Sequence, residues 1–432
     1  MPKKSKLLNQ LGENLTEIKE NINIEDLPLV FLEELTNSIA YSVTDYRADI
    51  SYQPLENIIM ITFVGLLANC NEWSEIYEFA VMHKEWFNKF LNLKYGIPSK
   101  STILKTMYVV DPNELEEACV YIIIQKINQL IELFPSNKNE ENDSKDVIAY
   151  DGKFCCSSKR NSTKEGEILP VNAMTAFNVT KDLPLATKFI SEKTNEIPTG
   201  PELINLLDLT NTISTFDALN TQSKTIKAIA DKGGDYVAAL KGNQHNFYKD
   251  VVDYFNDKKL YEEAYNNCHY ETTERAHNTV EKRIYVVTED IKWLDTKKWE
   301  KIKSIGMVIR EYEEKGKSKR DIRYYISSLG CNDIKDFCRA VRDEWGIENN
   351  LHWHLDVTFK EDKNRTANKN AQANLNILRK LALNILKLVQ PLYNKSLKLI
   401  RFRIGQNFEN EIEQILLYLN TEELKRIINQ TQ

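Results

Sequence analysis

The chain has 432 residues, of which 42% are hydrophobic and 28% charged, so it is large enough to bury the cores of two or more domains. Its longest apolar stretch, Ile58 to Ala68, is interrupted by Thr62 and is far shorter than the roughly 20 residues of a membrane span. No apolar signal-peptide core follows the basic first residues, and the seven scattered cysteines form no CxxC pair. These features predict a cytoplasmic protein with reduced thiols and no membrane partner.

The net charge of −6 at first argues against binding to nucleic acid, but the charge is unevenly distributed. Residues 1–150 are net acidic and residues 151–432 are net basic. Between Asn376 and Arg403 every charged residue is basic, namely Arg379, Lys380, Lys387, Lys395, Lys398, Arg401 and Arg403. Such a run is typical of a stripe that contacts phosphates, and equally of a solvated helix face, and the sequence leaves both readings open.

Residues 1–134 are predicted to form a mainly helical domain. Apolar residues recur at helical spacing from Leu27 to Phe134. The break at Gly96-Ile97-Pro98-Ser99 ends one helix, and Ser99 or Ser101 provides an N-cap for the next. The polar stretch 135–146 lacks large apolar residues after Pro135, and we interpret it as a linker between domains.

From residue 147 the pattern changes to short apolar runs that alternate with helical segments, which predicts a mixed α/β sheet. The expected strands are Val147–Tyr150, Ala173–Val179, Leu185–Ile190, Ile213–Phe216 and Tyr236–Leu240, with a helix over 222–231. We assign residues 147–390 to this domain, with a β-rich insertion at about 245–330. From Asp333 onward the pattern is helical, and residues 391–432 are predicted to form a basic-to-mixed helical tail.

Three carboxylates are candidates for a metal site. Asp151 and Asp217 each follow a short apolar strand, at the sheet edge where ligands bind, although aspartate is also common in turns. Glu348 extends a helical stripe of apolar residues, Ile334, Phe337, Val341 and Trp345, when each residue advances about 100°. A carboxylate on a buried face needs a cation or hydrogen bonds, unless it lies at the end of the stripe and reaches solvent.

Several other groups have two readings. Lys241-Gly242-Asn243-Gln244 follows a strand and can present amides and a cation to phosphate, or form a plain turn. His352 is compatible with DNA contact or with packing, and Lys315 to Arg320 reads as a basic hairpin tip. No GxxxxGK[ST], HExxH or GxSxG motif occurs, so nucleotide hydrolysis, zincin and serine-hydrolase chemistry have no support.

The chain resembles the H-repeat-associated (ISAs-type) insertion-sequence transposases of the DDE class over nearly its whole length. The resemblance rests on a series of blocks in order rather than on one motif. They include Asp45-Tyr46-Arg47, Asp151-Gly152-Lys153, Glu192-Lys193-Thr194-Asn195-Glu196-Ile197, Thr215-Phe216-Asp217-Ala218, residues 234–244, Arg275 with His277, Glu281 and Arg283, residues 324–329, Trp345-Gly346-Ile347-Glu348-Asn349, Leu351-His352-Trp353 and residues 355–362.

This resemblance implies a ribonuclease-H-like mixed sheet with a β-rich insertion and an N-terminal helical accessory domain. It implies that Asp151, Asp217 and Glu348 are the catalytic triad and hold two Mg²⁺ ions, with Mn²⁺ able to substitute. The implied reaction is nicking of DNA at element ends and strand transfer into target DNA, by a homodimer in the synaptic complex, near the bacterial nucleoid. Candidate DNA-binding residues are Lys153, Lys241, Asn243, Gln244, Arg342, His352, Arg365 and Arg379.

The family pattern also leaves an alternative open. Related transposases have a basic residue one helical turn before the glutamate, where this chain has Glu344. After Lys153 the chain has Phe154-Cys155-Cys156 in place of the expected Thr, Leu and Arg or Gly, and Thr279 stands where the family tends to have Arg. The second hypothesis is therefore a catalytically impaired or repurposed DNA-binding protein derived from a transposase.

Overall fold

A computed structural model describes residues 29–47, 51–133, 145–154, 160–161, 167–168, 172–190, 196–276, 279–314 and 317–420. Most of the predicted linker 135–146, residues 192–195 of the second family block, Cys155 and Cys156, His277 and the first two residues of the hairpin tip lie outside these ranges. Within them, no helix is long and apolar enough to cross a membrane.

Two compact units make up the chain, and they do not follow the order of the sequence. The helical unit comprises Met1–Glu140, Phe154–Asn172 and His352–Gln432, and the sheet unit comprises Glu141–Lys153 and Ala173–Leu351. The domain ranges expected from the sequence stay predictions. The structure groups the C-terminal helices with the N-terminal ones because α14 (Lys369–Tyr393) packs against α3, α6 and α7, at Leu55–Leu67, Lys100–Val109 and Pro112–Leu133.

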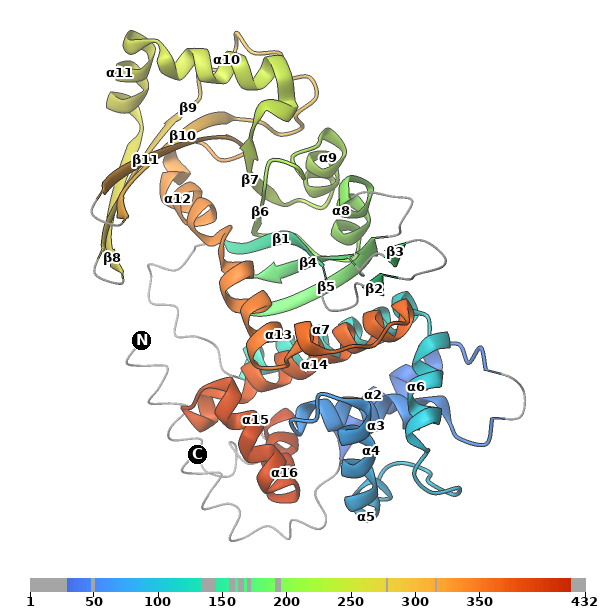
Figure 1. Cartoon of the computed structure of the whole chain (residues 1–432). Coiled ribbons are helices and arrows are strands. Elements are labelled where there is room, and N and C mark those ends of the chain that lie inside the picture. Colours follow the sequence, from blue (N-terminus) through green and yellow to red (C-terminus); the bar gives the residue numbers. More distant parts are fainter. Residues whose placement is uncertain are drawn as a thin grey trace. The chain divides into compact units, whose positions relative to one another are not determined.

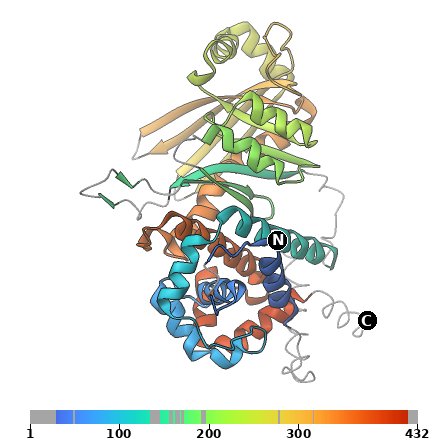
Figure 2. The same cartoon turned by 90° about the vertical axis from the view of Figure 1, so that its right-hand side faces the viewer.

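The helical unit is built around α3, which is apolar on all sides. Its residues from Asn57 to Leu67 are all buried, as expected of a helix without a polar face. Figure 2 shows a blue helix end-on within a ring of other helices of this unit. The other elements are α2 (Val30–Ser42), α4 (Trp73–Met82), α5 (Lys84–Phe87), α13 (Trp353–Val357), α15 (Leu397–Gln406), α16 (Phe408–Leu419) and the short strands β2 (Arg160–Asn161) and β3 (Glu167–Ile168).

The sheet unit contains one nine-stranded sheet in the order β5-β4-β1-β6-β7-β11-β10-β9-β8 (Figure 1). Strands β1, β6 and β7 are parallel, and β7, β11, β10, β9 and β8 pair antiparallel in turn. The strands are β1 (Asp146–Phe154), β4 (Asn172–Asn178), β5 (Leu183–Ile190), β6 (Thr212–Phe216), β7 (Asp235–Leu240), β8 (His269–Ala276), β9 (Thr279–Thr288), β10 (Ser304–Glu314) and β11 (Lys317–Ser327).

All five strands predicted between residues 147 and 240 are present, as is the helix α9 (Ser223–Asp231). Numbered in chain order, these five strands lie 3-2-1-4-5 across the sheet, which is the order of the ribonuclease-H-like fold. The expected β-rich insertion starts with α10 (His245–Asn256) and α11 (Lys258–Asn267). Its four strands then extend the same sheet beyond β7 instead of forming a separate one.

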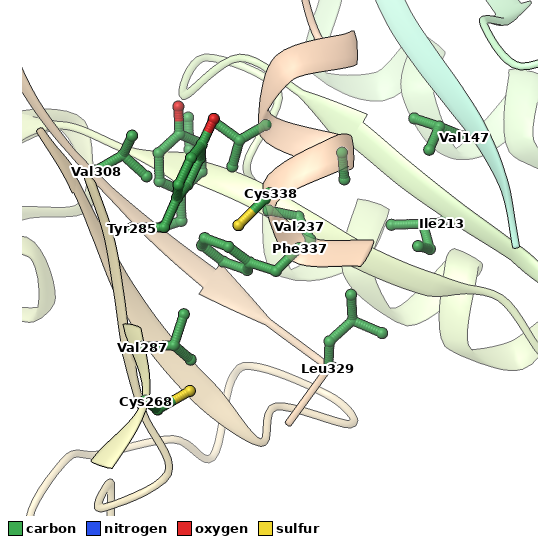
Figure 3. Close-up of a cluster of buried hydrophobic side chains, with 14 of the residues drawn as sticks. Val147, Ile213, Val237, Cys268, Tyr285, Val287, Val308, Leu329, Phe337 and Cys338 are labelled. Carbon is green, nitrogen blue, oxygen red and sulfur yellow. The ribbon is translucent and has the colours of Figure 1, made fainter. Parts of the chain in front are cut away.

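Helix α12 (Ile334–Asp343) covers one face of the sheet, and α8 (Glu196–Asn205) and α9 lie on the other (Figure 1). The α12 side chains Phe337, Cys338 and Val341 enter a buried cluster with residues of six strands (Figure 3). The Phe337 ring lies directly on Gly306 of β10, where an added Cβ would come within 2.5 Å of the ring. This packing fixes the direction in which the chain leaves α12.

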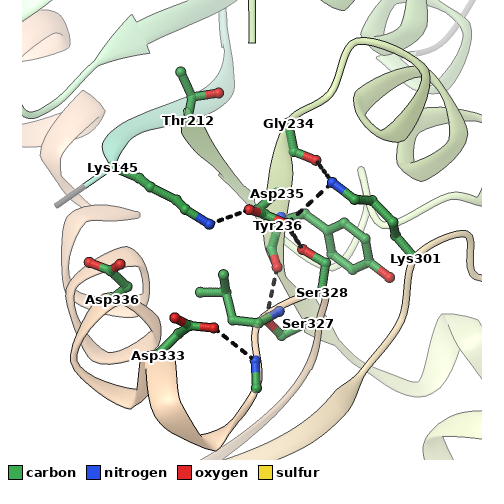
Figure 4. Close-up of polar contacts among 12 residues, drawn as sticks. Lys145, Thr212, Gly234, Asp235, Tyr236, Lys301, Ser327, Ser328, Asp333 and Asp336 are labelled. Atoms are coloured by element: carbon green, nitrogen blue, oxygen red, sulfur yellow. Dashed lines mark hydrogen bonds and ion pairs between the residues drawn. The ribbon is translucent and has the colours of Figure 1, made fainter. Parts of the chain in front are cut away.

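A polar network connects the N-terminal ends of the parallel strands, whereas Asp151 and Asp217 lie toward their C-terminal ends (Figure 4). At the start of β7, Asp235 accepts a hydrogen bond from Lys145 at 2.5 Å and one from the Ser328 hydroxyl at 2.8 Å. Lys301 lies 3.5 Å from the same carboxylate. Although burial raises the pKa of Asp235, these partners lower it below its usual value. The network therefore serves the fold and not the candidate site.

Candidate active site

Asp151 and Asp217 lie at equivalent positions on neighbouring parallel strands. The register of β1 and β6 pairs Tyr150 with Phe216, and each aspartate is the next residue along its strand. Residues at the same level of adjacent strands point to the same face and are roughly 5 Å apart. Both aspartates are half-buried, so they retain access to solvent toward the C-terminal ends of these parallel strands.

The loop after β6 holds the Asp217 carboxylate in a defined orientation. One carboxylate oxygen accepts hydrogen bonds from the backbone N–H and the side-chain amide of Asn220, both at 3.1 Å. Thr221 donates to the backbone carbonyls of Asp217 at 3.2 Å and Ala239 at 2.6 Å, which ties the loop to β7. Within the described ranges the second oxygen of Asp217 has no hydrogen bond, so it is available to a cation or a substrate.

The turn at Lys241-Gly242-Asn243-Gln244 supports the same loop. The side-chain amides of Asn243 and Gln244 donate to the Ala218 carbonyl at 2.7 and 2.9 Å. Gln244 also donates to Thr221 at 3.1 Å and accepts from the Lys241 N–H at 2.8 Å. Both amides were candidates for DNA contact, but here they connect two loops. Lys241 has an exposed side chain and is the residue of this turn best placed to meet a phosphate.

The predicted apolar stripe does not continue to Glu348. Helix α12 ends at Asp343, a turn follows at 344–345, and the chain resumes as the π-helix Ile347–His352. The turn and the wider π-helical winding change the helical phase, so extrapolation at 100° per residue fails here. Trp345 is 45% exposed and Glu348 is also exposed. The argument that Glu348 is a buried carboxylate was therefore wrong, whereas its proposed role does not depend on burial.

Glu344, one turn earlier, is half-buried. One of its oxygens, Oε2, is inaccessible and has no hydrogen-bond partner in the described parts of the chain. Burial raises the pKa of Glu344, and the charge of Asp217 adds to the shift, while Arg323, Lys241 and Tyr325 oppose it. The sequence marked Glu344 only as a departure from the family pattern. Its burial beside Asp217 was not predicted, because it depends on where α12 ends.

The three candidate carboxylates do not form a closed metal-binding group. Across the described ranges, no cluster of three or more His, Cys, Asp or Glu side chains is close enough to hold an ion. Asp151 and Asp217 are brought together by the sheet, and Glu348 lies on the π-helix that follows α12.

Lys153 and Arg342 are the two remaining DNA-binding candidates of the sheet unit. Lys153 is two residues after Asp151 on β1, so the alternation of a strand puts it on the same face. Arg342 is 44% exposed and forms a salt bridge at 2.9 Å with Glu274 of β8. Arg342 therefore already forms an ion pair with a carboxylate. Lys153 lies on the strand that carries Asp151, so it is the stronger candidate for a phosphate contact beside the aspartates.

His352, Arg365 and Arg379 belong to the helical unit. His352 is half-buried and Arg365 is exposed. Arg379 is only 3% exposed and lies 3.5 Å from the equally buried Glu361. Lys380, Lys387 and Arg401 of the same basic run are also buried, so the run does not form an exposed stripe for phosphate.

A ribonuclease-H-like sheet with an aspartate at the same level on each of two neighbouring parallel strands is the arrangement expected of DDE-class transposases. The model of the family described as "Transposase DDE domain" matches residues 143–385 of this chain, and that described as "DDE_Tnp_1-associated" matches residues 41–121. The chain belongs to the transposase DDE domain family.

The chain is also similar to several curated proteins. It is 30% identical over 353 residues to the H repeat-associated putative transposase YhhI of Escherichia coli K12, which covers 80% of this chain and 88% of the relative. It is 28% identical over 279 residues to an uncharacterized protein in the dhlA 3′ region of Xanthobacter autotrophicus, covering 63% and 87%. A solved piggyBac transposase synaptic complex with hairpin DNA has a TM-score of 0.41 and 11% identity, covering 93% and 79%, a likeness too low to carry weight.

Proposed function

We propose that this protein is an insertion-sequence transposase that nicks DNA at the ends of its element and transfers the freed 3′-hydroxyl to target DNA. The observation that carries the proposal is the pairing of Asp151 and Asp217 at adjacent strand ends within a domain of the transposase DDE family. The two residues are half-buried toward the C-terminal ends of the strands, where a phosphodiester could approach both.

The donor set fits divalent metal ions. Carboxylate oxygens are the ligands that Mg²⁺ prefers, and Mg²⁺ keeps several waters, so two or three carboxylates suffice. Asp151 and Asp217 would hold the ions, and Glu348 would complete the set from the π-helix. When bound, such ions activate the attacking hydroxyl and stabilise the leaving oxygen of the phosphodiester. Mg²⁺ is the expected ion, with Mn²⁺ able to replace it.

The π-helix gives Glu348 a structural basis for this role. π-Helical turns are rare and are frequent at functional sites, where the wider turn redirects the side chains that follow. Gly346 lies just before the π-helix, where an added Cβ would come within 2.5 Å of Val179 after β4. This close approach fixes the position of the backbone just before the π-helix that carries Glu348.

Residues around the carboxylates would position them and bind the DNA backbone. Asn220 orients Asp217 and leaves its second oxygen available, and the amides of Asn243 and Gln244 hold the loop. Lys153 and Lys241 would neutralise phosphate oxygens next to the reaction centre. The partners are the double-stranded terminal inverted repeats of the element and target DNA, and joining two ends calls for a homodimer in the synaptic complex.

A second candidate function is DNA binding without catalysis. The position of Glu344 beside Asp217, where related transposases have a basic residue, favours this candidate, because the charge of Asp217 helps to raise the pKa of Glu344. It differs from the first proposal in one measurable property, because a protein of this kind binds element ends and leaves them intact.

Cleavage of a labelled duplex that carries the inverted repeat flanking the gene separates the two candidates. We expect wild type to nick it in Mg²⁺, and Asp217→Asn to lose at least about a hundredfold of the rate because a charged ligand is removed. Asp231→Asn is the matched control, since Asp231 is exposed on α9 and forms an ion pair with Lys227 on the same helix. Equal cleavage by wild type and Asp217→Asn would refute the site, and binding without cleavage by wild type would establish the second function.

A further inference from the structure

The helical unit contains an open cleft of about 1180 Å³ that the candidate active site does not use. Three segments line it. These are the start of α4, the face of α6 that carries Lys100, Leu104 and Tyr108, and residues 362–367 before α14. The α6 residues recur every fourth position, so they form one continuous wall.

The walls of the cleft are fastened to one another by side-chain hydrogen bonds. Trp73 of α4 donates its indole N–H to the Thr366 hydroxyl at 2.8 Å. The Asn364 amide donates to the Asn71 carbonyl at 3.2 Å, and the Asn370 amide donates to the Tyr108 carbonyl at 3.0 Å. The segment before α14 is therefore held to the start of α4, and the first turn of α14 is held to α6, so the walls of the cleft are fixed to one another.

The cleft favours an anion. Lys100, Lys363 and Arg365 line it with exposed side chains, and none of them has an ion pair in the parts of the chain that the structure describes. They outnumber the two acidic side chains there, Glu72 and Asp362. In addition α4, α6 and α14 all begin at or next to this cleft, and the positive ends of helix dipoles favour negative charge.

The aromatic side chains of the cleft indicate which class of anion it binds. Trp73 is half-buried with its indole N–H engaged, and Tyr108 is 36% exposed. Aromatic faces beside unpaired cations are the combination that binds nucleic acid, with phosphates at the cations and bases or sugars at the rings. An acidic protein would form ion pairs with the cations, but its carboxylates would make no specific contact with the aromatic rings.

We propose that this cleft of the helical unit is a second DNA-binding site, which holds a stretch of sugar-phosphate backbone. The inference rests on the proposed function in that DNA is the substrate. Arg365 and Lys363 contact phosphates, and Trp73 and Tyr108 lie against the bases or sugars of the same stretch.

The test measures binding of the full chain to fluorescent DNA by anisotropy in EDTA, so that it does not depend on metal or on cleavage. We expect Arg365→Glu and Lys363→Glu each to weaken binding roughly tenfold at 0.1 M salt and to reduce the salt slope by about one, as loss of one phosphate contact requires. The matched control is Lys398→Glu, an exposed lysine of α15 outside the cleft, which should bind as wild type. Single-stranded and duplex probes of equal length show which form the cleft prefers.

Photocrosslinking of wild type to bromodeoxyuridine-substituted DNA keeps the test decisive if a charge-reversed variant fails to fold. Crosslinks at Trp73 or Tyr108 would support the cleft. Equal binding by wild type and Arg365→Glu, an equal loss in Lys398→Glu, or displacement of the crosslink by polyglutamate at the DNA's own concentration would overturn it. Wild type that binds in this way but does not nick DNA in Mg²⁺ would refute the proposed reaction and leave the cleft standing.

Discussion

The buried carboxyl group of Glu344 lies within reach of the charge of Asp217, whereas Glu348, one turn further along the chain, is exposed. This relationship follows from the end of α12 at Asp343 and from the π-helix that begins at Ile347. A buried carboxyl group next to a second carboxylate is expected to keep its proton at a higher pH than usual.

We predict that Glu344→Gln stabilises the protein at pH 8 and has little effect at pH 4. The pKa of Glu344 is raised in the folded chain, first by burial and then by Asp217, so the folded state holds this proton more tightly than the unfolded state. Stability from this group is present below the ordinary pKa of a glutamate and falls as the pH rises above it. Thermal unfolding followed by circular dichroism from pH 4 to 8 measures the difference. A variant that is less stable than wild type at pH 8 would contradict the assignment.

We predict that Asn243→Ala lowers the rate of DNA cleavage without changing DNA affinity. The Asn243 amide donates to the Ala218 carbonyl at 2.7 Å, so its loss loosens the loop that carries Asp217 and costs about 1 kcal/mol of stability. Nicking rates and anisotropy on the same duplex separate the two effects, and Asn256→Ala at the end of α10 serves as the control. Weaker DNA binding with unchanged cleavage would show that Asn243 contacts DNA directly.

We predict that Asp235→Asn destabilises the sheet unit by about 2 kcal/mol at pH 7, because it removes a charge-assisted hydrogen bond with Lys145. The pKa of Asp235 is lowered in the folded state, so its contribution is present above the ordinary aspartate value and is lost as the pH falls through the folded value. Urea unfolding at pH 7 and pH 3 measures this dependence. An equal loss at both values would mean that packing, and not charge, is responsible.

We predict that Arg379→Met costs about 3–5 kcal/mol of stability, because it leaves Glu361 as a buried charge. The double variant Arg379→Met with Glu361→Met should recover much of this loss, since both charges are then absent. Denaturant unfolding of the two variants and wild type provides the comparison. If Arg379→Met instead folds as well as wild type and weakens DNA binding, the original DNA-contact prediction would be restored.

The strands that carry the aspartates could be predicted from the sequence because their signal is local. Apolar runs that end at Asp151 and Asp217 are buried strands, and the parallel pairing of β1 and β6 puts both at one edge. The order of the sheet beyond β7 could not be predicted, because it depends on the pairing of β11 with β7, far earlier in the sequence, whereas β8 to β11 each pair with the next strand along the chain. The family resemblance, and not periodicity, implied the ribonuclease-H-like order.

The predictions that were wrong for Glu348 and for α14 both came from helical periodicity. Periodicity assumes that a helix keeps its phase and that polar residues face solvent, and neither holds at Glu348 or on α14. The π-helix changes the phase before Glu348. On α14, Asn374, Asn376 and Arg379 are buried and partnered by backbone carbonyls or by Glu361, which composition alone does not reveal.

Binding of Mn²⁺ to the full chain, followed by electron paramagnetic resonance, tests most directly the central claim that Asp151 and Asp217 form a metal site. We predict that wild type binds Mn²⁺ and that Asp151→Asn and Asp217→Asn each weaken binding at least about tenfold, since each removes a charged oxygen ligand. Asp231→Asn, on the exposed surface of α9, should bind as wild type. If both strand-end variants bind Mn²⁺ as tightly as wild type, the paired aspartates are not a metal site.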